Sequence, residues 1–103
     1  MLVMLNKYET VYIVKPNISE DVNLALINEY KNLVRKSGGR NVFVQYKGRR
    51  HLSYDIMHYY DGIYVQVNYE GNGNLVRTIE KSMHFNSNII RYLTVKRKSV
   101  IHV

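Results

Sequence analysis

Cysteine is absent from the 103-residue sequence. Without thiols the chain can form no disulfide scaffold, no thiolate zinc site and no cysteine nucleophile. Long apolar runs are lacking too, because the apolar opening, residues 1–5, is followed at once by Asn6 and Lys7. That opening is too short for a signal peptide, and no later stretch has the length of a membrane span. We therefore expect neither a disulfide-stabilised protein nor a membrane partner.

Patterns of catalytic residues are missing as well. Neither of the glycine-rich motifs that cradle nucleotide phosphates occurs, and Ser53 does not lie in a nucleophile elbow. The histidines show no spacing typical of a metal site; they are His51, His58, His84 and His102. We therefore expect no metal, no other cofactor, no small-molecule substrate and no enzymatic activity.

The sequence does contain an excess of positive charge. Its formal net charge is +7, and 46% of its residues are hydrophobic while 22% are charged. That composition is typical of a folded protein, and the length fits a single domain, 1–103, with a core of about 7–98. The charge favours polyanionic partners, nucleic acid before an acidic membrane.

Alternation and helical spacing predict six elements of secondary structure. The β-branched and aromatic residues from Tyr8 to Val14 are typical of a strand, and Pro16 ends it. Ser19 is a candidate helix cap, and Gly38-Gly39 marks the end of that helix. The remaining elements are strands at 42–46, 63–69 and 89–96, and a second helix capped by Asn74 and closed by Asn86.

The order β-α-β-β-α-β predicts an α+β, ferredoxin-like sandwich: a four-stranded antiparallel sheet with two helices on one face. Alternation places Ile63, Val65 and Val67 beneath the helices. The open face should carry Tyr64, Gln66, Asn68, Arg91, Leu93 and Val95, with Val11 and Ile13 favoured over the alternative set Thr10, Tyr12 and Val14. Half of this face is apolar, whereas a solvated sheet face is normally polar. We expect either a protein partner on it or scattered surface apolar side chains.

Basic residues gather at two places. Arg49 and Arg50 lie in the stretch 47–56, and a second cluster, residues 96–98, ends the last strand. Guanidinium groups match the geometry of phosphate oxygens. Lys7 should lie near Lys96, because the first and last strands of this fold are antiparallel neighbours. Whether the two arginines join them depends on where the second strand lies.

The stretch 47–56 alternates as well. Leu52, Tyr54 and Ile56 share one side of an extended chain, so we expect them to anchor it to the domain. Arg50 lies on that same side. Arg49 points the other way and should be the freer phosphate contact.

Several short matches extend over residues 7–98. They are Tyr8-Glu9, Pro16, Gly38-Gly39, Gly48-Arg49-Arg50-x-Leu52-x-Tyr54-x-Ile56, Gly62, Tyr64, Phe85-Asn86 and Ile90-Arg91. With them the sequence resembles the bacterial-type family of small-subunit ribosomal protein S-six. It departs from that family at Ser53-Tyr54-Asp55, where Ala-Tyr-Pro is common, and in its short basic tail.

The resemblance implies the ferredoxin-like fold and a structural role in the ribosome of a plastid stroma or bacterial cytoplasm. It also implies binding to the central domain of small-subunit ribosomal RNA together with ribosomal protein S-eighteen. The candidate RNA contacts are Lys7, Tyr8, Arg49, Arg50, Arg91 and Lys96, and the candidate partner-protein face is Val11, Ile13, Tyr64, Gln66 and Leu93. The alternative function is a small-molecule-sensing regulatory domain that forms a homodimer through its sheet.

Overall fold

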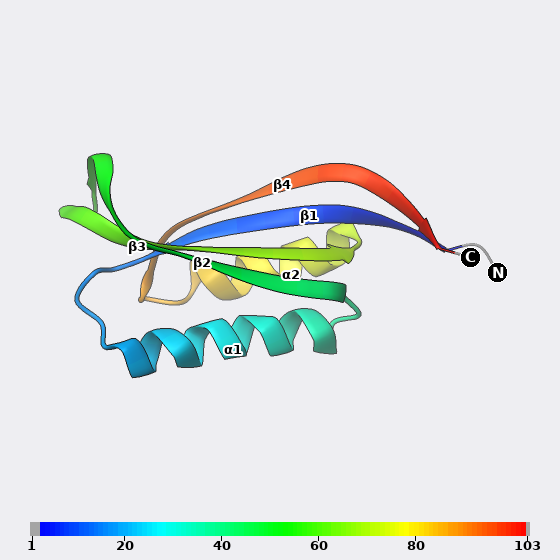
Figure 1. Cartoon of the computed structure of the whole chain (residues 1–103), viewed down its shortest axis with the longest axis horizontal. Coiled ribbons are helices and arrows are strands. Elements are labelled where there is room, and N and C mark those ends of the chain that lie inside the picture. The colour runs from blue at the N-terminus through cyan, green and yellow to red at the C-terminus, as the bar shows by residue number, and fades with distance from the viewer. Residues whose placement is uncertain (1–2, 103) are drawn as a thin grey trace.

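The computed structural model describes residues 3–102, with side chains described for residues 6–97. Within residues 3–102 the elements are β1 (Val3–Val14), α1 (Glu20–Lys36), β2 (Arg40–Ile56), β3 (Tyr59–Gly71), α2 (Gly73–His84) and β4 (Ile89–His102). The strands form one antiparallel sheet in the order β2-β3-β1-β4. Both helices cover the same face of that sheet (Figure 1). The predicted ferredoxin-like fold is confirmed.

Helix α1 begins and ends where its sequence predicts. The side-chain oxygen of Ser19 accepts a hydrogen bond from the backbone N–H of Val22 at 3.3 Å, which satisfies one free donor of the first turn. After the last turn, Gly38 has a φ of +95°, a left-handed conformation that glycine adopts without steric cost.

Helix α2 begins two residues earlier than predicted. Its cap is Asn72 and not Asn74, because the side-chain oxygen of Asn72 accepts the N–H of Leu75 at 3.0 Å. The end is close to the predicted one: the helix ends at His84, and the backbone N–H of Asn86 bonds the carbonyl of Met83 in the turn that follows.

Strand β2 is much longer than the predicted 42–46. The basic stretch is itself strand, and it forms a hairpin with β3 whose tip projects beyond the two layers (Figure 1). The turn uses Met57 and His58, both with positive φ, the conformation of a tight hairpin turn. Gly48, at φ +88°, forms a bulge that lets the strand continue past Tyr46. Strands β1 and β4 also exceed their predicted limits.

The core lies between the sheet and the helices. Tyr12, Val14, Val65 and Val67 rise from the sheet and pack against one side of each helix, including Leu26, Tyr30, Val34, Ile79 and Met83. The predicted burial of Ile63, Val65 and Val67 is confirmed. Burial raises the pKa of the Tyr12 hydroxyl, and the neighbouring Tyr30 raises it further. No helix among the described residues is long and apolar enough to cross a membrane.

Candidate functional site

The open face of the sheet brings together residues from three neighbouring strands. Val11 pairs with Gln66 of β3 and Leu93 of β4, and Ile13 pairs with Tyr64 and Arg91 in the same way. Cross-strand partners share a face, so Val11 and Ile13 lie on the open face as predicted. Leu93 is 64% exposed. The structure therefore gathers the candidate partner-protein residues on one surface.

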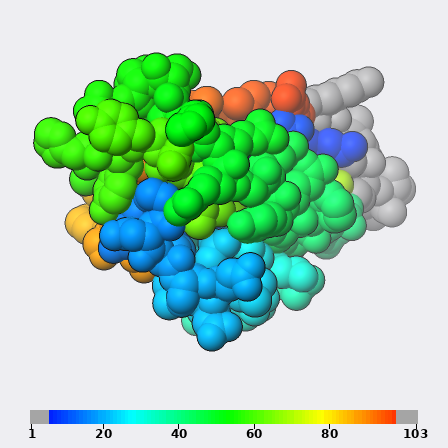
Figure 2. Space-filling model, turned by 60° about the vertical axis from the view of Figure 1, so that its left-hand side comes forward, coloured from blue at the N-terminus to red at the C-terminus, as the bar shows by residue number. Residues whose placement is uncertain are grey.

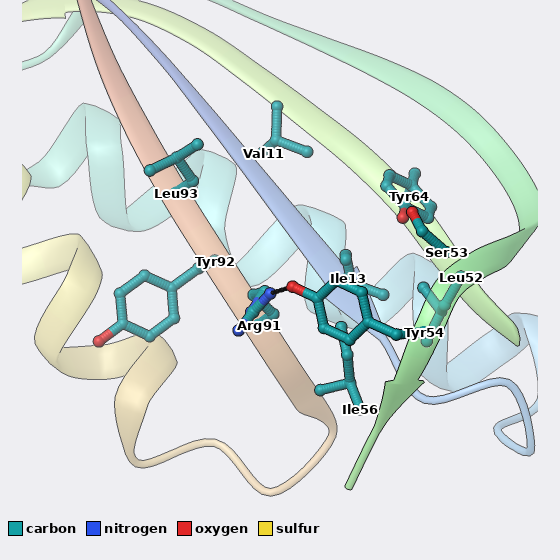
Figure 3. A pocket seen from close by; sticks show the side chains of 10 residues that line it. All are labelled: Val11, Ile13, Leu52, Ser53, Tyr54, Ile56, Tyr64, Arg91, Tyr92 and Leu93. Atoms are coloured by element: carbon teal, nitrogen blue, oxygen red, sulfur yellow. Dashed lines mark hydrogen bonds between the residues drawn. The ribbon is translucent and has the colours of Figure 1, made fainter. Parts of the chain in front are cut away.

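A groove of about 340 Å³ crosses this face where the β2–β3 hairpin bends over it. Figure 3 shows side chains of β2 reaching toward β1 and β4 from one side. The lining is mostly apolar: Val11, Ile13, Leu52, Ser53, Tyr54, Ile56, Tyr64, Arg91, Tyr92 and Leu93. Leu52, Tyr54 and Ile56 share this side of β2, as the alternation predicts, although Tyr54 remains 58% exposed.

Two arginines lie at this groove, each against a tyrosine. The guanidinium of Arg91 donates a hydrogen bond to the Tyr54 hydroxyl and its Cζ lies 5.6 Å from the centre of that ring (Figure 3). The Cζ of Arg50 lies 5.9 Å from the centre of the Tyr64 ring. Both arginines are exposed. Because each guanidinium has five N–H donors, these contacts leave donors for phosphate or carboxylate oxygens.

Arg49 already has a hydrogen-bond partner within the domain. It lies on the helix side of β2, since it pairs with the buried Ile63. Its Nη2 donates a hydrogen bond to the carbonyl oxygen of Pro16 at 2.7 Å. Arg49 thus points away from the side of Arg50, as expected, and one of its donors connects the hairpin to the turn after β1, while Arg50 contacts the Tyr64 ring.

The remaining candidate residues lie at the far end of the sheet. Lys7 pairs with Glu70, and Tyr8 pairs with Lys96, so Lys7 and Lys96 are neighbours as expected. Tyr8 is only 8% exposed, and its ring stacks on Tyr69 with 5.8 Å between centroids. The core thus holds most of its ring.

These basic residues form two clusters and not one. Along β1, Lys7 is separated from Val14 by roughly 20 Å, at about 3.3 Å per residue. Val14 pairs with Ile63, which pairs with Arg49. Arg49 and Arg50 therefore lie at the opposite end of the sheet from Lys7, which answers the question that the sequence left open.

Two ion pairs on the surface were not predicted. Arg97 contacts Glu9 with 2.8 Å between nitrogen and oxygen, and this hydrogen bond raises the pKa of the arginine. His51 Nδ1 lies 2.5 Å from Asp61 Oδ1 across the hairpin. The opposite charge of each pair is visible in the sequence, but only the strand register brings the partners together.

The open sheet face thus joins an apolar groove to exposed arginines, features that are typical of a surface for a large partner. The model of the family described as Ribosomal protein S6 matches residues 7–96. The chain belongs to this family, which is the S-six family that its sequence resembles.

Individual relatives agree with this assignment. A small ribosomal subunit protein of the plastid type, bS6c, from Gracilaria tenuistipitata var. liui is 62% identical over 92 residues, covering 89% of each chain. The small ribosomal subunit protein bS6 of Picosynechococcus sp. is 41% identical over 93 residues, covering 90% of this chain and 81% of the relative. The crystal structure of 30S ribosomal protein S6 from Thermotoga maritima has a TM-score of 0.85 at 24% identity, covering 90% and 88%.

The family assigns the chain to the small ribosomal subunit of a plastid or a bacterium. It is a structural component and not an enzyme. The alternative of a small-molecule-sensing regulatory domain is weaker, because it rests on the fold alone.

Proposed function

We propose that this chain binds the central domain of small-subunit ribosomal RNA and docks ribosomal protein S-eighteen on its open sheet face. The observation that carries the proposal is the groove, which apolar side chains and Arg91 line, and beside which Arg50 contacts the ring of the lining residue Tyr64. Apolar area and phosphate-binding donors are adjacent there. The two partners would therefore meet at the edge of one site.

Arg50 and Arg91 should contribute most to RNA affinity among the candidate contacts. Both side chains are exposed, and their tyrosine neighbours hold each guanidinium in place, which reduces the entropy cost of binding. Arg49 is exposed but hydrogen-bonded to Pro16, so its contribution should be smaller. Lys7 and Lys96 would meet phosphate at the other end of the sheet, whereas Tyr8 has little surface to offer.

The protein contact lies on the strands between these two ends. Leu93 and Val95 of β4 are exposed apolar residues on the open face, and Phe43 of β2 lies on the same face through its pairing with Asn68. Phe43 and Val95 lie in one row on the two outer strands, with Asn68 and Glu9 between them. A sheet face with several exposed apolar side chains is typical of a protein interface. Val11, Tyr64 and Gln66 are partly exposed and complete the surface, whereas Ile13 is only 7% exposed and adds little area.

The test measures affinity for a central-domain RNA against salt concentration, with and without S-eighteen. Arg50→Ala with Arg91→Ala should make the salt dependence shallower by about one unit for each phosphate that the arginines neutralise. Arg77→Ala is the matched control, because Arg77 is an exposed arginine on α2, in the opposite layer. Parallel salt plots for the double variant and wild type would refute the RNA site.

The protein face needs its own variant. Leu93→Asp introduces a charge among apolar side chains, so it should abolish the gain in RNA affinity that S-eighteen produces. RNA affinity of the isolated chain should fall somewhat, because the new carboxylate lies beside Arg91 and repels phosphate, so the gain is taken as the ratio of RNA affinities with and without S-eighteen for each variant. If the gain persists in this variant, S-eighteen does not dock on the open face.

A further inference from the structure

A second pocket lies on the helix side of the sheet, between α1 and the outer strand β2. In Figure 2 the green atoms of β2 lie against the blue and cyan atoms of α1 and of the turn before it. The pocket has a volume of about 210 Å³ and is lined by Glu20, Asn23, Leu24 and Ile27 of α1 and Tyr46 of β2. The four helix residues have the spacing of one helix face. Tyr46 pairs with the buried Val65 and therefore lies on the helix side.

Asn23 is the polar residue in this pocket that carries the argument. It is 5% exposed, and its Oδ1 has no hydrogen-bond partner among the residues that the structure describes. An amide oxygen that is removed from water without a donor is unfavourable. The side chains at the mouth, Leu24 and Tyr46, are both more than half exposed, so they can move aside for a ligand. The site thus lacks a donor group.

Glu20 supplies negative charge beside that oxygen. It is the first residue of α1 and exposed, and within the described part of the chain its carboxylate forms no ion pair. Asp21 follows it directly. Arg49 also lies on this side of β2, where it bonds the carbonyl oxygen of Pro16, so the two carboxylates are not the only charges near the pocket. Because carboxylates repel phosphate, RNA is a poor occupant for this pocket.

The walls of the pocket suit the stem of a long cationic side chain. Leu24 and Ile27 offer apolar surface to methylene groups, and the face of the Tyr46 ring attracts a cation. We propose that this pocket binds a lysine or arginine side chain from a partner protein. The charged head donates to Asn23 Oδ1 and pairs with Glu20 while the stem packs on the apolar walls. This surface is separate from the open face, so the inference does not rest on the proposed RNA and S-eighteen sites.

The experiment follows side-chain and backbone NMR signals of the purified chain during titration with two blocked tripeptides. One is Gly-Lys-Gly, and its matched control carries norleucine, which keeps the stem but lacks the charge. The lysine peptide should shift the signals of Asn23, Ile27 and Tyr46 in a saturable manner, with a dissociation constant in the millimolar range. The norleucine peptide should shift them little. Equal shifts by both peptides, or none by either, would overturn the proposal.

Variants separate the proposed contacts from general surface charge. Glu20→Gln should weaken binding of the lysine peptide by about two- to fivefold, the usual value of an exposed ion pair. Glu29→Gln, an exposed site on the same helix, should have no effect. Asn23→Leu should abolish the peptide response and unfold at a higher temperature, because it removes the unpartnered oxygen. A third titration uses a single-stranded oligonucleotide as a polyanion. If it shifts the NMR signals of the pocket residues, the pocket binds RNA and the proposal fails.

Discussion

Replacing Tyr12 by phenylalanine should stabilise this protein. Tyr12 is fully buried, its ring lies 5.6 Å from that of Tyr30, and its hydroxyl has no hydrogen-bond partner within the described residues. A buried hydroxyl without a partner costs about 1–3 kcal/mol. Its removal leaves a gap of one oxygen atom, which offsets part of that gain. We expect Tyr12→Phe to raise the free energy of unfolding by about 1 kcal/mol.

Two other buried tyrosines provide matched controls. The Tyr69 hydroxyl is hydrogen-bonded to Thr10 at 2.9 Å, and the Tyr30 hydroxyl accepts a hydrogen bond from Asn86 at 3.2 Å. Tyr69→Phe and Tyr30→Phe remove the same atom but break a hydrogen bond, so each should lower the free energy of unfolding by about 0.5–1.5 kcal/mol. In all three variants the same atom is deleted from a buried ring, and in Tyr12 alone of the three that hydroxyl has no partner among the described residues.

Urea unfolding measures all three against wild type. The dependence of the unfolding free energy on urea concentration should be unchanged, because the surface exposed on unfolding is nearly the same. The thermal midpoint should rise by about 4–8 °C for each 1 kcal/mol of added stability. If Tyr12→Phe is destabilised as much as Tyr69→Phe, the Tyr12 hydroxyl has a partner in solution and the reasoning is refuted.

Three further predictions concern stability. Leu26→Ala should cost about 2–5 kcal/mol in urea unfolding, because Leu26 is buried in the core; a cost below about 1 kcal/mol would contradict its placement. Asn72→Ala should lower the free energy of unfolding by about 1 kcal/mol, because it removes the helix cap, whereas Asn74→Ala should lower it little. Equal losses would contradict the assigned start of α2. Burial raises the pKa of Tyr12, Tyr30 and Tyr69 above 10.0, so the folded state disfavours their ionisation. Their contribution to stability should be full below pH 10.0 and fall as the pH rises above it, which unfolding curves at successive pH values can check.

The fold could be predicted well because several local signals agree. Ser19 and Gly38 mark the two ends of α1, and the alternation around Val65 sets which face of β3 is buried. The length of β2 could not be predicted, because its turn at Met57 and His58 lacks the glycine or asparagine that usually marks a hairpin.

The site was harder to predict than the fold. Arg50 and Arg91 lie on the two outer strands, so only the bend of the hairpin brings their surroundings into one groove. The bond from Arg49 to Pro16 depends on how the hairpin and the first turn meet in space. The pocket at Asn23 gives no sequence signal, since an asparagine on a helix is normally a solvated residue.

The irregular course of β2 has a consequence for how the free protein behaves at high concentration. An outer strand presents unpaired backbone groups to which another chain can add, and this is a common route to aggregation. In β2 the register shifts between Arg40 and Phe43 and again between Tyr46 and Gly48, and Asn41 has a positive φ. A third shift follows between His51 and Ile56, and a strand interrupted in this way is a poor template for a straight, continuous neighbour. Its cationic side chains also repel a second copy of the chain. This edge therefore disfavours self-association of the free protein.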